Sequence, residues 1–83
     1  MIKYSYKKEL RPDLEIAMLK VTPFPDWQAF PDFVKQFIAA EEADVIVQDY
    51  GMDRHQIRYR KKGKQYILQF EHYTDSIWIE ADS

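Results

Sequence analysis

The fold is decided by the stretch RHQIRYRKKGKQYILQFEHYTDSIWIEA, residues 54–81. Apolar and polar residues alternate along it, which is typical of β-strands with one buried face. The alternation runs through residues 54–61, 64–72 and 77–81, and turn residues around Gly63 and at 73–76 separate the three runs. We therefore expect three antiparallel strands joined by two hairpins.

The lengths of the two turns predict the register of these strands. A two-residue turn at Lys62 and Gly63 places three pairs on one face: Tyr59 with Tyr66, Ile57 with Leu68, and His55 with Phe70. A two-residue turn at Thr74 and Asp75 continues the same face: His72 with Ile77, Phe70 with Ile79, and Leu68 with Ala81. Because both turns give one consistent apolar face, we expect a helix to cover it.

The opposite face of these strands, called here the outer face, is polar but carries a tryptophan and an isoleucine. Its predicted rows are Arg54, Glu71 and Trp78; Gln56, Gln69 and Glu80; Arg58 and Ile67; and Arg60 and Gln65.

Upstream, apolar residues at helical spacing predict one amphipathic helix that ends near Glu42. Its apolar stripe consists of Trp27, Phe30, Phe33, Val34, Phe37 and Ile38. Pro31 leaves two alternatives for the start. Either a short turn at 26–30 precedes a helix that begins near Pro31, or one longer helix is kinked there.

Three further strands are predicted around the helix, at residues 2–7, at 14–21 after a turn at 8–13, and from Val45 to a turn at Gly51. Both faces of the strand at 14–21 are apolar. The facing of the third strand depends on its turn. A two-residue turn at Gly51 and Met52 sets Asp49 beside Arg54 and places Val45 and Val47 on the outer face, whereas a three-residue turn reverses this.

The predicted fold is an α+β two-layer sandwich, a single domain over residues 1–83 with one amphipathic helix on a mostly antiparallel sheet. The order of elements is β-β-α-β-β-β-β. The helical connection allows the second and third strands to run parallel, and the strand order is otherwise open.

Composition restricts the classes of function. Apolar residues make up 46% of the chain, aromatic residues make up 16%, and there is no cysteine. Disulfides, thiolate zinc sites and a cysteine nucleophile are therefore excluded. Because the N-terminal residues contain no apolar signal segment and no apolar run is long enough to span a bilayer, we expect a cytoplasmic protein that does not bind membranes.

The first functional hypothesis is a small non-enzymatic interaction module that binds itself, as a homodimer, or another protein. A two-layer domain leaves one sheet face uncovered, and Trp and Arg are enriched where interfaces gain most of their energy. The candidate partner-binding residues are Arg54, Ile67, Glu71 and Trp78, joined by Val21 or Leu19. The alternative is that Trp78 packs flat on its neighbours with Arg54 over its ring.

The second hypothesis is a domain that binds nucleic acid or another polyanion. From Arg54 to Phe70 there are six basic residues and no acidic residue. The candidate polyanion-binding residues are Arg58, Arg60, Lys61, Lys62 and Lys64. Against this, Tyr59 points to the opposite face from Arg58 and Arg60, and lysines at a hairpin tip also keep a sheet soluble.

Catalytic, cofactor and metal sites are not predicted. Ser76, His72 and Asp75 are close in the chain, but hydrogen bonding within a turn explains them better than nucleophilic catalysis does. Asp49, Asp53 and His55 surround Gly51 without the spacing of a metal motif. Two isolated glycines cannot form a phosphate-binding loop.

Overall fold

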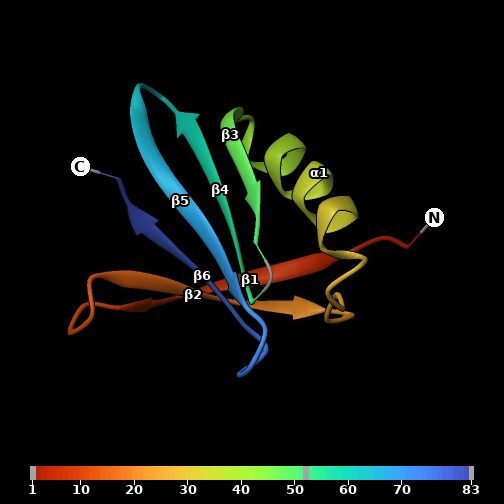
Figure 1. The fold of residues 1–83 in the computed structure, drawn as a ribbon. Helices are drawn as coiled ribbons and strands as arrows, with labels where there is room; N and C mark the ends of the chain where they lie inside the picture. Colours follow the sequence, from red (N-terminus) through yellow and green to blue (C-terminus); the bar gives the residue numbers. More distant parts are fainter. Residues whose placement is uncertain (1, 52, 83) are drawn as a thin grey trace.

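The computed structural model describes residues 2–51 and 53–82. One helix packs on a six-stranded sheet, so the predicted α+β fold is confirmed (Figure 1). The elements in chain order are β1 (Ser5–Arg11), β2 (Ile16–Thr22), α1 (Phe30–Glu41), β3 (Asp44–Tyr50), β4 (Arg54–Lys61), β5 (Lys64–Glu71) and β6 (Ser76–Ala81).

The strands are ordered β1-β2-β6-β5-β4-β3, and every neighbouring pair is antiparallel. Strands β2 and β3 therefore run in the same direction, but β6, β5 and β4 lie between them. Figure 1 shows β1 and β2 crossing β4 and β5 at a steep angle, as expected for a strongly twisted sheet. The result is a central β4-β5-β6 meander extended on one side by the β1-β2 hairpin.

The β4-β5 hairpin has the predicted register. Tyr59 pairs with Tyr66, and Ile57 pairs with Leu68. Lys62 and Gly63 both have positive φ angles, 52° and 78°. Two successive positive φ values are the signature of the tight hairpin turn that matches strand twist.

The predicted register of β5 with β6 is wrong by two residues. Phe70 pairs with Ile77 rather than Ile79, because the turn occupies residues 72–75 instead of two residues only. The Glu71 carboxylate accepts a hydrogen bond from the Thr74 amide (2.9 Å), which stabilises the longer turn. A shift of two residues keeps each side chain on its expected face. His72 lies exposed in the turn, but its ring centroid is 4.9 Å from that of Trp27, so it is on the helix-facing side as predicted.

The first hairpin lies further along the chain than predicted. The turn occupies residues 12–15, so residues 8–11, expected in a turn, belong to β1. Pro12 begins this turn, and the Leu14 amide bonds to the Arg11 carbonyl (3.0 Å). Glu15 closes it with a φ of 55°. The alternation at 2–7 does mark β-structure, but pairing with β2 begins at Ser5.

The helix follows the first of the two predicted alternatives. A turn at 27–29 precedes it, and the Asp26 carboxylate accepts a hydrogen bond from the Ala29 amide (2.7 Å). Pro31 then falls in the first turn of α1, where no amide hydrogen is needed. The helix ends at Glu41, and Glu42 adopts a left-handed conformation (φ 54°) that turns the chain towards β3.

The core lies between α1 and the helix-facing side of the sheet. Its fully buried members include Phe30, Phe33, Phe37, Ile57, Leu68 and Phe70. Trp27 closes one end by stacking on His55 with ring centroids 3.5 Å apart. His55 is therefore buried on the helix-facing side, as predicted.

Strand β3 forms an edge of the sheet, and all seven of its residues are exposed. Asp49 pairs with Gln56 and Val47 with Arg58, so both lie on the outer face. An irregularity in pairing between Val45 and Val47 places Val45 opposite Tyr59, on the helix-facing side. The expectation that Val45 and Val47 share a face is therefore wrong. Asp49, expected beside Arg54, is opposite Gln56, so the register expected from a two-residue turn at Gly51 and Met52 is wrong by two residues. Met52 itself lies outside the described residues.

We expect Ile46→Lys to slow heat-induced aggregation. Val45, Ile46 and Val47 are consecutive exposed aliphatic residues on an edge strand, whereas the β1 edge is rich in lysine and arginine. A charge on an exposed edge deters pairing with other chains. Static light scattering during a thermal ramp measures the effect. Leu14→Lys, an exposed turn position, is the control, and equal aggregation of both variants would contradict the expectation.

Candidate functional site: the outer sheet face

The outer face has a half-buried apolar centre, called here the apolar cluster and made of Ile16, Met18, Ile67 and Trp78. Pairing holds these side chains together. Met18 lies opposite Trp78, while Ile16 and Ile67 flank Glu80. The cluster therefore spans β2, β6 and β5 on the side of the sheet away from α1.

The composition of this cluster corrects one prediction. Leu19 and Val21, expected beside Trp78 and Ile67, are 4% and 7% exposed in the core beneath α1. Ile16 and Met18, on the opposite face of β2, take their place. The alternation along β2 separates these two pairs, but only the pairing of β2 with β6 shows which pair adjoins Trp78.

A chain of side-chain hydrogen bonds fixes the polar groups beside the apolar cluster. The side-chain amide of Gln56 donates to the side-chain oxygen Oε1 of Gln69 (3.1 Å). The Gln69 side-chain amide donates in turn to the Glu80 carboxylate (2.6 Å). The Trp78 indole N–H donates to the other Glu80 oxygen (3.2 Å). Gln69 is only 4% exposed although it faces away from the helix. Ordered side chains lose less entropy when a partner binds than mobile ones do.

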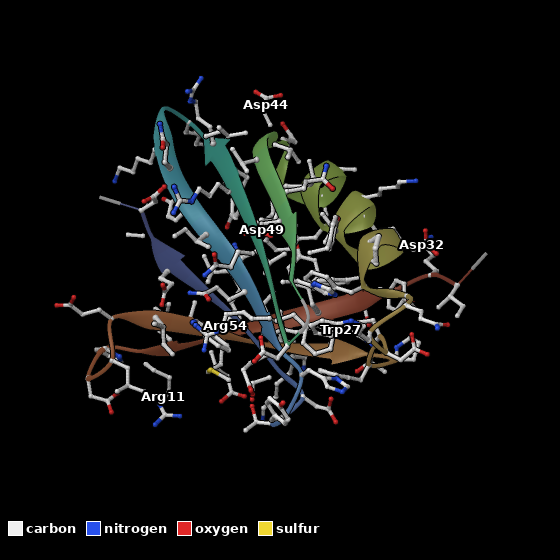
Figure 2. The ribbon with its side chains drawn as sticks, in the orientation of Figure 1. Arg11, Trp27, Asp32, Asp44, Asp49 and Arg54 are labelled. Carbon is white, nitrogen blue, oxygen red and sulfur yellow. The ribbon has the colours of Figure 1, made fainter. Side chains whose placement is uncertain are left out.

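Arg54 lies over the Trp78 ring, with its guanidinium carbon 5.8 Å from the ring centroid. The position of Arg54 over the ring is the one expected under the alternative to partner binding, in which Trp78 packs against its own neighbours. Figure 2 shows Arg54 and Trp27 on opposite sides of the β4-β5 ribbon, in agreement with their assignment to opposite faces. Trp78 as a whole is half-buried.

Glu71 lies opposite Arg54 on β5, as predicted, but beside Ser76 rather than Trp78 on β6. The hydrogen bond from the Thr74 hydroxyl holds the pKa of Glu71 below its usual range. Of the four predicted partner-binding residues, Arg54 and Trp78 touch, Ile67 belongs to the same apolar cluster, and Glu71 mainly orders the neighbouring turn.

The predicted polyanion-binding residues divide between the two faces. Arg58 and Arg60 lie on the outer face, and Arg58 is within 3.9 Å of Asp82. Lys61 pairs with Lys64 across the hairpin on the helix-facing side, and Lys62 lies in the turn. Polyanion binding by the whole set stays a prediction, and it requires a ligand that reaches both sides of the β4-β5 hairpin.

Comparison with known proteins identifies the family. A family model described as "Protein of unknown function (DUF3630)" matches residues 8–83. The chain belongs to this family. Searches of curated proteins and of solved structures found no match to this DUF3630 chain.

Two further observations describe this DUF3630 chain. Over residues 2–51 and 53–82, no helix is both long and apolar enough to cross a membrane. In the same part of the chain, no three His, Cys, Asp or Glu side chains are grouped as metal ligands.

Proposed function

We propose that this chain is a small non-enzymatic interaction module that binds a second copy of itself through the outer sheet face. The observation that carries the proposal is the apolar cluster around Trp78, which lies on the face opposite α1 with charged residues beside it. Protein interfaces share this arrangement of an apolar centre within a polar rim. Trp and Arg, which meet here as Trp78 and Arg54, are the residues most enriched at interface hot spots.

The distribution of charge favours a second copy as the occupant. Three outer-face arginines, Arg54, Arg58 and Arg60, lie on β4, while Glu80 lies on β6 beyond Ile67. A two-fold axis that runs along the strands between β5 and β6 sets β4 of one copy opposite the β2-β6 side of the other. Arg58, which lies in the same row as Glu80, then approaches Glu80 of the second copy on both sides of the axis, so this pair of charges is complementary across the interface. Arg54 instead lies over the end of β2 that carries Lys20, where the charges are alike.

The size of the domain also favours association. A standard interface buries about 800 Å² per partner, which is roughly one-seventh of the 5779 Å² surface of this chain. Stacked sheets lie about 10 Å apart, a distance that the side chains of the apolar cluster can fill from both copies. Small domains often gain stability in this way.

We expect Arg58→Glu to weaken self-association by about tenfold or more, because the two-fold axis introduces the unfavourable charge twice. Arg58 is exposed, so the fold should tolerate the change. Light scattering coupled to size exclusion, across a dilution series, measures the association. Lys35→Glu, an exposed position on α1 with the same change in charge, is the matched control.

Trp78→Ala tests the centre of the same face, and circular dichroism confirms that the variant is folded. We expect folded Trp78→Ala to be a monomer at concentrations where the unaltered chain is a dimer. A chain that is monomeric throughout the dilution series, or an Arg58→Glu variant that associates as strongly as Lys35→Glu, contradicts the proposal.

A further inference from the structure

A second candidate site lies on the helix-facing side, at the end of the sheet that α1 leaves uncovered. Figure 1 shows the C-terminal end of α1 and the tip of the β4-β5 hairpin at the same end of the sheet. A cavity of about 350 Å³ lies there, which is within the usual size range of small-molecule sites. The polar side chains around it are Lys8, Glu41, Lys61, Lys62 and Lys64, called here the lysine pocket.

The floor of the lysine pocket is apolar. It is formed by Leu10, Ala17, Tyr59, Tyr66 and Ile79. Leu10 pairs with Ala17, which pairs with Ile79, so all three share the helix-facing side of the sheet. Because α1 ends at Glu41, no helix within residues 2–51 and 53–82 covers this part of the sheet, and Leu10 is 77% exposed. The helix-facing side of the sheet therefore extends past the end of α1 as an apolar surface that is exposed to solvent.

Glu41 forms ion pairs with only two of the four lysines of the lysine pocket. It bonds to the ammonium groups of Lys8 (2.5 Å) and Lys61 (3.0 Å), and it accepts a hydrogen bond from the Tyr6 hydroxyl. Lys8 and Lys61 also suit the carboxyl end of a helix, where cations are favoured. Among the described residues, neither Lys62 nor Lys64 has an acidic side chain within ion-pair distance. Two positive charges thus remain uncompensated beside an exposed apolar floor.

We propose that the lysine pocket binds a small organic anion, with its carboxylate, sulfonate or phosphate group between Lys62 and Lys64. The apolar body of the ligand lies on Leu10 and Tyr66. Lysine ammonium groups act as point charges for such anions. The apolar floor selects against inorganic ions.

This site is independent of the proposed self-interface, because it lies on the other side of the sheet. The test is a fluorescence titration of the folded full chain with anilinonaphthalene sulfonate, which carries one sulfonate on an aromatic body. We expect saturable binding at one site per chain. The double variant Lys62→Gln/Lys64→Gln should weaken binding by about tenfold. Lys7→Gln/Lys35→Gln removes two exposed lysines elsewhere and should leave the affinity unchanged.

One competitor, one variant and one uncharged analogue of the dye define the class of ligand. We expect inorganic phosphate to displace the dye only weakly, and we expect Leu10→Ser to lower the affinity for the dye. Unchanged affinity in Lys62→Gln/Lys64→Gln overturns the proposal. So does equally tight binding of anilinonaphthalene without the sulfonate, because the anion would then be irrelevant. Displacement of the dye by phosphate at similar concentrations also overturns it, because the apolar floor would then contribute nothing.

Discussion

Replacing Phe70 by alanine is expected to destabilise the fold by about 3–5 kcal/mol, the usual loss for a buried phenylalanine. The Phe70 side chain is fully buried. Its ring packs against Trp27 and Phe30, with centroid distances of 5.4 and 4.9 Å, and joins the helix to the centre of the sheet. For a domain of this size the melting temperature should fall by about 15 °C or more. Thermal unfolding followed by circular dichroism measures the shift.

Tyr73→Ala is the matched aromatic control, because Tyr73 lies in the β5-β6 turn and is 79% exposed. Its effect should stay within about 0.5 kcal/mol, as for most surface substitutions. Equal melting temperatures for the two variants would contradict the position assigned to Phe70 in the core.

Stability should fall as the pH is lowered from about 4.5 to about 2, and Glu41 should cause much of that loss. Burial alone would raise the pKa of Glu41, but hydrogen bonds from Lys8, Tyr6 and Lys61 outweigh burial and lower this pKa to about 2. The unfolded chain therefore binds a proton at Glu41 before the folded chain does. The stabilisation is complete above pH 4.5 and is lost as the pH approaches 2. Because Lys8 and Lys61 are partly exposed, we expect about 2 kcal/mol.

Glu41→Gln isolates this contribution from that of the other carboxylates. Urea unfolding at pH 7 should show the variant to be less stable than the unaltered chain by about 2 kcal/mol. At pH 2 much of the difference should disappear, because Glu41 is then protonated in the unfolded chain and about half protonated in the folded chain. A gap that is the same at both pH values would show that the ion pairs around Glu41 add nothing to stability.

The hydrogen bonds and backbone angles within each turn decide which strand registers could be predicted from the sequence. Lys62 and Gly63 form the short hairpin turn that their spacing implies, so the β4-β5 register was correct. The β5-β6 turn was longer because the Glu71 side chain bonds to residues of the turn, which spacing alone does not reveal. The side chains of β6 still lie on their predicted faces, because the register shifted by two residues, an even number. The irregularity in β3 moved Val45 by one position, which reversed its face.

The candidate sites were less predictable than the fold, because they depend on strand order. Trp78, Ile67 and Arg54 could be placed on one face from the alternation within 54–81. Met18 became a neighbour of Trp78 only through the pairing of β2 with β6, which joins segments distant in the chain. In the same way, Lys8 meets Lys61 only because both reach Glu41 at the end of α1. Long-range pairing of this kind leaves no local signal in the sequence.

The most direct test of the outer-face interface is an isotope-filtered NOE experiment on a mixture of labelled and unlabelled chains. It detects only contacts between two copies. We expect NOEs from the Trp78 indole of one copy to methyl groups of Ile16, Met18 or Ile67 in the other. NOEs confined to α1 or to β3, or none at a concentration where the mass is that of a dimer, would contradict this expectation.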